Sequence, residues 1–348
     1  MTHTLLSQRH KQELREKGVT VVENVIPSTT CDEYINEYQE WLKKFSNAEG
    51  IPFPNTENSG FSLIQGYRIG HFAATWGARL HAKRVYAELW DTQKLLTSID
   101  GVAIGRPPED GTTEFYAGDN EFIDSKGNIH RKPKKHWLHI DQKHKRLGLH
   151  AFQGAVYLEE ATSIDWCFTV MEGSHKFHDT FFNNCPTSDT NNSSSLRPRN
   201  LLESEVDWFL ERGCAVRRIG APKGGMVIWD ARLVHANAFP KQNRKHRERW
   251  RYCVFTTMTP AIWGTKKTLR NKREAYTNMF LTTHWASQGG RVWQDTRSTP
   301  ENTITELPDI ARSLNARQLA GMDPYDFNDG QPNGPDWTPK WESGYTDY

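Results

Sequence analysis

His139 and Asp141 stand two residues apart in the stretch HWLHIDQ, and both side chains are able to bind a metal ion. Side chains of an extended strand alternate between its two faces, so residues two apart point the same way. His235, in the stretch GGMVIWDARLVHAN, supplies a third candidate ligand. Two histidines and one carboxylate form a facial triad that leaves three positions open on a non-haem Fe(II).

The same residues also have an interpretation without a metal. The chain contains 14 histidines, and a polar strand at a sheet edge could carry several of them. Two features favour the metal site. The strand before His235 opens with two glycines, as a strand that re-enters a barrel often does. The 94 residues from Asp141 to His235 are enough for several antiparallel strands to bring the two ends of a sheet together.

Residues 112–260 have the pattern of a β-rich region. Short segments rich in β-branched and aromatic residues alternate there with turn signals. They are TTEFYAG, KHWLHID, HAFQGAVYLEEA, DWCFTVMEGS, CAVRRIGAPKGGMVIWD and RWRYCVFTTMTP. Most gaps lack a helical pattern, which favours an antiparallel sandwich or barrel. The polar gap at 177–200 is predicted to be a surface loop that leads into a short helix, LLESEVDWFLERG.

Helical patterns flank this region on both sides. The predicted helices are a polar one near the N-terminus, one from residue 28 to 45, one from about 73 to 96, and two at 265–280 and 308–320. Ser28, Thr29 or Thr30 is expected to cap the second of these helices with its side chain. GVTVVENVI and LLTSIDGVAIG are each predicted to be one strand, and residues 46–70 a loop.

The length of 348 residues suits one large domain or two modest ones. We expect a single domain over residues 1–348. Within it, residues 1–96 would form a helical support region and residues 97–262 the β core. Residues 263–348 would form a helical and extended tail.

Composition bears on the partners and the compartment. The formal net charge is +2, which gives no reason to expect binding to nucleic acid or to a membrane surface. The five cysteines are scattered and contain no CxxC pair, as is typical of a reducing compartment. The N-terminal stretch lacks an apolar signal-peptide core, and no run approaches the roughly 18 apolar residues of a membrane span. We therefore expect a cytoplasmic protein that acts on a small molecule.

Five segments in order resemble the phytanoyl-CoA dioxygenase-like group of Fe(II)/2-oxoglutarate oxygenases: WLHIDQ, FQGAVYLEEAT, VMEGSHKFHDTFF, GGMVIWDARLVHAN and RWRYCVFTTMTPA. The likeness spans about residues 97 to 262. It implies a mainly β fold with flanking helices around a double-stranded β-helix, the cupin-like jelly-roll. It also implies Fe(II) held by His139, Asp141 and His235, with 2-oxoglutarate and O2 as cosubstrates. Related enzymes that halogenate lack the carboxylate, so Asp141 favours hydroxylation over halogenation.

The resemblance further implies an arginine, after the distal histidine, that binds the far carboxylate of 2-oxoglutarate. A planar guanidinium meets a carboxylate through two parallel hydrogen bonds. In RWRYCVF, positions 249, 251, 253 and 255 share one face, and Cys253 and Phe255 make it the interior face. Arg251 lies deepest in the strand and is the predicted clamp, with Arg249 as the alternate. Residues 241–247 are predicted to form a solvated basic hairpin.

Residues on the strands next to the triad have two interpretations each. Gln153 could hydrogen-bond 2-oxoglutarate or the substrate, and it could equally be a satisfied core amide. Asp230 and Arg232 match the resemblance, yet an ion pair beside the core residue Trp229 would be structural. The sequence leaves both pairs of alternatives open.

Residues in the turns around these strands favour plainer roles. His175 is expected to form part of a Gly-Ser-His turn and only secondarily to reach the substrate. Gln142 and His144 could line the mouth of the site, although a solvated edge is the simpler account. The basic run at 131–135 could bind an anionic substrate, and a solvated loop is the more common outcome for such a run.

Taken together, the residues predict an Fe(II)- and 2-oxoglutarate-dependent dioxygenase that hydroxylates a C–H bond of a small molecule and releases succinate and CO2. One alternative is the same cofactor chemistry with desaturation, epimerisation or cyclisation as its outcome. Others are a non-catalytic β-barrel binding module and a zinc or manganese cupin-like isomerase. Loops 46–70 and 176–200 are expected to contact the substrate.

Overall fold

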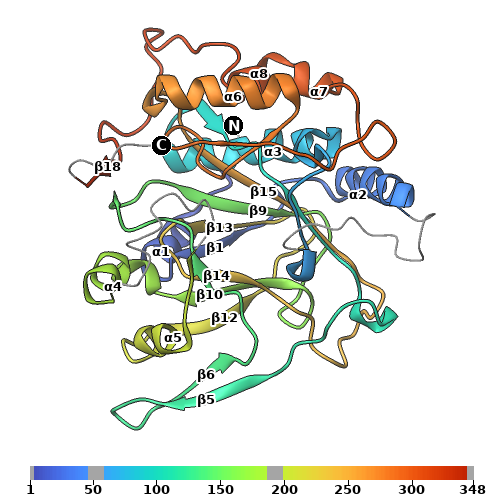
Figure 1. Cartoon of the computed structure of the whole chain (residues 1–348). Coiled ribbons are helices and arrows are strands. Elements are labelled where there is room, and N and C mark those ends of the chain that lie inside the picture. Colours follow the sequence, from blue (N-terminus) through green and yellow to red (C-terminus); the bar gives the residue numbers. More distant parts are fainter. Residues whose placement is uncertain (1–3, 46–58, 186–198, 343–348) are drawn as a thin grey trace.

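Two antiparallel β-sheets form the centre of the computed structural model, which describes residues 4–45, 59–185 and 199–342 (Figure 1). The larger sheet has the strand order β1 (Val19–Val22), β13 (Met226–Asp230), β9 (Phe152–Tyr157), β15 (Arg251–Pro260), β4 (Val102–Gly105) and β2 (Leu63–Ile64), and β3 (Leu95–Thr97) pairs with β15. The smaller sheet has the order β11 (Arg199–Asn200), β7 (His139–Ile140), β14 (His235–Ala238), β10 (Cys167–Glu172) and β12 (Ala215–Ile219).

The space between the two sheets is filled by side chains from both of them. Ala155 and Tyr157 of β9 and Trp229 of β13 come from the larger sheet, and Phe168 and Val170 of β10 come from the smaller one. All five belong to one buried apolar cluster. Because side chains alternate along a strand, the neighbouring residues of the larger sheet point to its opposite face.

Helices α2 (Ser28–Leu42) and α3 (Ala73–Trp90) cover that opposite face. The hydroxyl of Tyr86 donates to the carbonyl of Thr256 at 2.6 Å, and the indole N–H of Trp90 donates to the carbonyl of Met258 at 2.8 Å. These two hydrogen bonds tie α3 to β15.

The remaining elements surround this centre. The other α-helices are α1 (Gln8–Glu16), α4 (His178–Asn184), α5 (Glu203–Leu210), α6 (Lys266–Asn278), α7 (Asp309–Arg312) and α8 (Leu314–Leu319). Short 3-10 helices occupy Lys43–Phe45, Ser59–Phe61, Ile69–His71, Pro108–Asp110, Ser174–Phe177 and Ala261–Trp263. Three small sheets pair β5 (Asp119–Ile123) with β6 (Ile129–Pro133), β8 (Arg146–Leu147) with β18 (Lys340–Trp341), and β16 (Leu281–Thr282) with β17 (Val292–Trp293). In Figure 1, α6 and α8 lie beside α3, while α4 and α5 lie beside the smaller sheet.

The predicted mixture of antiparallel strands and flanking helices is confirmed, and several predicted bounds are wrong. Helix α2 begins at Ser28, but Pro27 is its N-cap and no side chain caps it. Helix α3 ends at Trp90, six residues earlier than predicted, because Asp91 adopts a left-handed conformation with φ 50°. LLTSIDGVAIG forms two strands, β3 and β4, with residues 98–101 between them.

Other corrections concern the loops. Residues 112–118 do not form the predicted strand. The segment predicted as a polar loop contains α4 and β11, and its residues 186–198 lie outside the described part of the chain. The basic run at 131–135 begins within β6. Within the described residues, no helix has both the length and the apolar character needed to cross a membrane.

Candidate active site

Strands β7 and β14 bring the predicted metal ligands together. The two strands are neighbours in the smaller sheet, where His139 and His235 are directly paired, and Asp141 follows β7. One ligand atom from each of the three residues lies within 4.8 Å of the others. Nε2 of His235 is 3.3 Å from Oδ2 of Asp141, and Nε2 of His139 is 3.7 Å from Oδ1. All three side chains are buried.

Backbone carbonyls hold the two imidazole rings in one orientation. Nδ1 of His139 lies 2.7 Å from the carbonyl oxygen of Trp137, and Nδ1 of His235 lies 2.9 Å from that of Leu233. A carbonyl can only accept, so each Nδ1 carries the proton and each Nε2 keeps its lone pair. Burial and the neighbouring His235 lower the pKa of His139 to about 4, which keeps this ring neutral at pH 7.

Gln153 and Trp229 orient the carboxylate of the triad. The amide N–H of Gln153 donates to Oδ2 of Asp141 at 2.8 Å, and the indole N–H of Trp229 donates to the amide oxygen of Gln153 at 3.0 Å. The indole therefore decides which end of the amide faces Asp141. Burial opposes ionisation of Asp141, but His284 and His235 hold its pKa well below the ordinary value. The predicted contact of Gln153 with the cosubstrate or the substrate stays a prediction.

The triad faces a cavity of about 260 Å³ that lies between the sheets. Trp137, Phe168 and Phe255 contribute apolar surface to its wall. Gln65 and Asn200 also line it, and they come from the two loops that were predicted to contact the substrate. Residues 46–58 and 186–198 of those loops lie outside the described residues. The wall of the cavity is thus mixed, with polar and apolar groups in similar measure.

Two titratable residues of this wall were not identified from the sequence. His284 follows β16, and its Nε2 lies 3.5 Å from Oδ1 of Asp141. Asp100 lies between β3 and β4 and also lines the cavity. A signal for Asp100 was present, because an Asp-Gly pair interrupts the apolar stretch LLTSIDGVAIG. His284 lies in LTTHWAS, where the resemblance to the oxygenases is weaker than in the five motifs and did not single out this residue.

Arg251 is a buried cation at the start of β15. It is 2% exposed, and its Nη2 donates to the hydroxyl of Tyr157 at 3.1 Å, while Nη1 lies 3.4 Å from the hydroxyl of Ser62. Its Nε has no hydrogen-bond partner. Among the described residues, its side-chain partners are these hydroxyls and the thiol of Cys253, and no carboxylate is paired with it. Burial of a charge is costly unless the charge is paired, so this guanidinium suits an anionic ligand.

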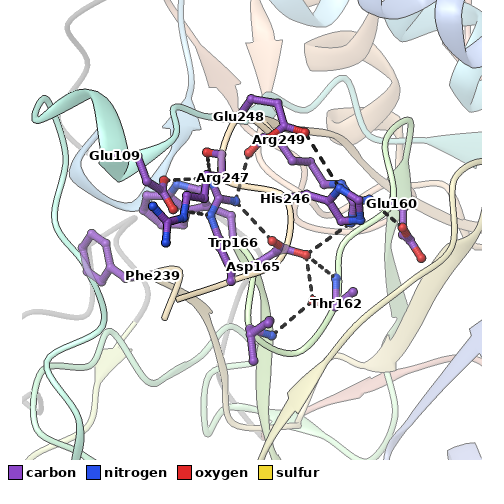
Figure 2. A network of polar contacts seen from close by, with 12 residues as sticks. Glu109, Glu160, Thr162, Asp165, Trp166, Phe239, His246, Arg247, Glu248 and Arg249 are labelled. Atoms are coloured by element: carbon purple, nitrogen blue, oxygen red, sulfur yellow. Dashed lines mark hydrogen bonds and ion pairs between the residues drawn. The ribbon is translucent and has the colours of Figure 1, made fainter. Parts of the chain in front are cut away.

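The alternate arginine has different surroundings, which Figure 2 shows. Arg249 precedes β15, with Nη2 2.8 Å from a carboxylate oxygen of Glu160 and Nη1 3.4 Å from one of Asp165. The prediction of a solvated hairpin at 241–247 is wrong for Arg244. This residue is 2% exposed, and its guanidinium contacts Glu109 at 2.9 Å and Asp165 at 3.1 Å.

The turn residues near the site have structural partners. Gln142 is fully buried, and its amide donates to the carbonyl of Arg146 at 3.0 Å, so the predicted solvated edge is wrong for it. The ring of His144 lies 5.7 Å from that of Phe182. His175 is part of the predicted turn, and its Nε2 lies 3.2 Å from the carbonyl of Arg15 in α1.

Two further charged groups are engaged in ion pairs. Arg232 binds Asp230 through two hydrogen bonds of 2.9 and 2.7 Å, which supports the structural interpretation of this pair. Lys132, in the basic run, is 8% exposed and lies 2.6 Å from Asp207. This lysine is therefore buried and paired, where the sequence predicted a solvated loop.

Comparison with known proteins extends over most of the chain. No family model matches it. The Ava biosynthesis cluster protein O of Aspergillus versicolor is 24% identical over 293 residues, which are 80% of this chain and 87% of that protein. The crystal structure of the GlcNAc inducible gene 2 product of Candida albicans is 14% identical, with a TM-score of 0.59 over 96% of this chain and 80% of that one. This likeness shows a shared fold.

A more distant likeness is to the epimerase SnoN in complex with Fe3+, alpha-ketoglutarate and nogalamycin RO. It has a TM-score of 0.45 and 13% identity over 73% of this chain and 83% of that one. A likeness of this size carries no argument about activity, so the chemistry has to be argued from the site.

Proposed function

We propose that this chain is an Fe(II)- and 2-oxoglutarate-dependent oxygenase that oxidises a C–H bond of a small molecule. The observation that carries the proposal is the convergence of His139, Asp141 and His235, with both Nε2 atoms available beside the carboxylate. Two imidazoles and one carboxylate are the donor set of non-haem iron oxygenases. We also propose that the two facing sheets are the halves of a double-stranded β-helix.

The residues present fit both of the groups that this chemistry needs. The triad would hold the iron, and Arg251 would bind the far carboxylate of 2-oxoglutarate. Bound iron and 2-oxoglutarate supply the oxidation: one atom of O2 enters succinate, CO2 is released, and the other oxygen atom enters the substrate. The protein contributes the geometry. Carbonyls orient both imidazoles, Gln153 orients Asp141, and aromatic side chains form part of the cavity wall.

Hydroxylation is the outcome that we favour, because Asp141 occupies the place that halogenating relatives leave free for a halide. Desaturation, epimerisation and cyclisation would use the same site and differ only in the product. A small-molecule substrate is supported by the size of the cavity and by the name of the curated relative, which refers to a biosynthesis cluster.

The deciding experiment supplies the purified chain with Fe(II), ascorbate and 2-oxoglutarate under air and measures succinate. Anaerobic addition of Fe(II) and 2-oxoglutarate is expected to produce a visible metal-to-ligand charge-transfer band. Asp141→Ala should lose both signals, because the triad loses its carboxylate. Asp124→Ala removes a buried aspartate outside the cavity and should keep both.

Other results would favour the rival functions. Metal binding by zinc or manganese, without the charge-transfer band and without succinate, would favour a cupin-like isomerase. Failure to bind Fe(II) at all, together with no succinate, would favour a non-catalytic binding module. Either result would overturn the oxygenase proposal.

A further inference from the structure

Asp100 presents a buried carboxylate to the cavity. The residue is 6% exposed, and its Oδ1 accepts a hydrogen bond of 3.0 Å from the backbone N–H of Gly101. Among the described residues, this N–H is the only hydrogen-bond donor to the carboxylate, and no ion pair is formed with it. Oδ2 is not among the fully buried polar atoms without a partner, so it is accessible from the cavity. Oδ2 is therefore ready to accept a hydrogen bond from a bound molecule.

The backbone around Asp100 is held from two sides. Arg79 of α3 is fully buried, and it donates to the carbonyl of Asp100 at 2.9 Å and to that of Gly70 at 2.5 Å. On the other side, Ile99 and Thr282 of β16 exchange two hydrogen bonds of 2.9 and 2.7 Å. The carboxylate is thus placed on a rigid support, as a binding group needs to be.

Gly101 allows the close approach that this arrangement requires. A Cβ at this position would lie 2.3 Å from the carbonyl oxygen of Ile64, so no other residue fits without a shift of the backbone. The conformation of residues 98–101, which include Asp100, therefore depends on the glycine at position 101.

His284 lies on the same wall of the cavity as Asp100. His284 lies two residues after Thr282, which is hydrogen-bonded to Ile99, the residue before Asp100. The segments that contain His284 and Asp100 are therefore neighbours. Nε2 of His284 is 3.5 Å from Asp141, and its side chain is 26% exposed. Asp100 is close enough to interact electrostatically with both His284 and Asp141. A molecule bound at Asp100 would therefore lie next to the triad.

We propose that Asp100 selects the substrate by accepting a hydrogen bond from an N–H or O–H group of a small, otherwise apolar molecule. Trp137 and Phe255 on the cavity wall provide the surface against which the apolar part packs. That this bond places a C–H group at the triad rests on the proposed oxygenase function, whereas the binding itself does not.

Three probes of similar shape test the binding step: 2-phenylethylamine, 2-phenylethanol and propylbenzene. Their dissociation constants are measured by ligand-observed NMR titration on the metal-free protein, without 2-oxoglutarate. Wild type should bind the amine or the alcohol about tenfold or more tightly than propylbenzene, because a hydrogen bond to a charged group is worth at least that factor. Asp100→Ala should bind all three with similar affinity.

Asp100→Asn keeps the shape of the side chain and removes its charge, so it also covers the case in which Asp100→Ala does not fold. If Asp100→Asn loses only the preference for the amine over propylbenzene, the group bound at Asp100 is a cation. If it loses the preference for the alcohol as well, the bound group is a hydrogen-bond donor that needs the carboxylate. Asp124→Asn is the matched control at a buried aspartate outside the cavity.

The proposal is overturned if wild type binds propylbenzene as tightly as the amine and the alcohol. It is also overturned if both Asp100 variants, folded as judged by thermal unfolding, keep the wild-type order of affinities. Because iron and 2-oxoglutarate are absent from this measurement, such a failure leaves the oxygenase proposal standing. A chain that makes no succinate but shows the predicted affinities would support Asp100 and refute only the oxygenase.

Discussion

Arg251 and Arg249 stand two residues apart in the sequence, and the structure gives them different partners. Arg249 is paired with Glu160 and Asp165, whereas Arg251 has hydroxyl groups and the thiol of Cys253 beside it. Strand periodicity placed both on one face, and depth in the strand favoured Arg251, but the partners of the two could not be predicted because they come from distant segments. The absence of a carboxylate partner among the described residues favours Arg251 as the proposed clamp, although this residue does not line the cavity.

We predict that Arg251→Ala raises the apparent KM for 2-oxoglutarate by roughly 30-fold or more. Removal of one partner of a desolvated charge pair costs about 2–5 kcal/mol, and every 1.4 kcal/mol is about tenfold in affinity. The measurement is succinate formation at varied 2-oxoglutarate. Arg249→Ala is the control and should stay within a few-fold of wild type. A larger rise for Arg249→Ala would show that the wrong arginine had been assigned.

Gln153 gives a second test, which concerns the orientation of a ligand. Gln153→Leu removes the hydrogen bond to Oδ2 of Asp141 and leaves the carboxylate free to rotate. Loss of such an outer contact typically lowers metal affinity by about 10- to 100-fold. Anaerobic Fe(II) titration measures this, with Gln12→Leu on the exposed face of α1 as control. Equal affinities for the two variants would refute an orienting role for Gln153.

At the scale of whole elements, local pattern predicted the strands of the sheets better than the segments between them. Strands β9, β10, β13 and β15 lie within the predicted segments, because apolar and β-branched residues dominate them. The division of LLTSIDGVAIG into β3 and β4 depends on Arg79 and Thr282, which are distant in sequence. Helix α4 was missed because its sequence, HDTFFNN, is short and mostly polar.

The loop between β14 and β15, which connects the two sheets, depends on a buried arginine in the same way. Arg244 binds Glu109 and Asp165, and it also donates to backbone carbonyls of residues 247 and 249. We predict that Arg244→Met lowers the free energy of unfolding by about 3–5 kcal/mol, because Glu109 loses its arginine and the buried Asp165 keeps only Arg249. Urea unfolding followed by circular dichroism measures the change.

Arg247→Met provides the matched control, because this side chain is exposed on the same loop. A surface substitution of this kind is expected to change stability by no more than about 0.5 kcal/mol. Similar effects of the two substitutions would show that the contacts of Arg244 add little to the stability of the protein.

At the scale of the whole molecule, the candidate site depends on segments from the full length of the chain. The triad was predictable because two ligands lie in one short motif and the third lies in another. The wall of the cavity was less predictable, since Gln65, Asn200 and His284 converge only through the fold. The C-terminal region was predicted as a tail, yet His284 places it directly at the triad.

Helix α6 joins this C-terminal region to the larger sheet through a buried lysine. Lys272 is 1% exposed, and its ammonium donates to the backbone carbonyl of Thr97 in β3. Burial, together with the nearby Arg79, lowers the pKa of Lys272 to about 7. The unfolded chain would keep the ordinary lysine pKa of about 10.4. Between these two values the unfolded state binds a proton that the folded state lacks.

The stability contribution of Lys272 therefore increases as the pH rises from about 7 towards 10. The slope is at most about 1.4 kcal/mol per pH unit for one proton, and below pH 7 the penalty for the buried charge is constant. We predict that the unfolding free energy of wild type rises steadily, relative to that of Lys272→Met, from pH 7 to pH 9. The buried cysteines also titrate in this range, and their burial makes the stability fall as the pH rises. Because both proteins contain the same cysteines, subtracting the two free energies at each pH cancels this effect. Urea unfolding at three pH values measures the difference. A difference that does not change with pH would mean that Lys272 stays charged in the fold, with α6 open to water at this point.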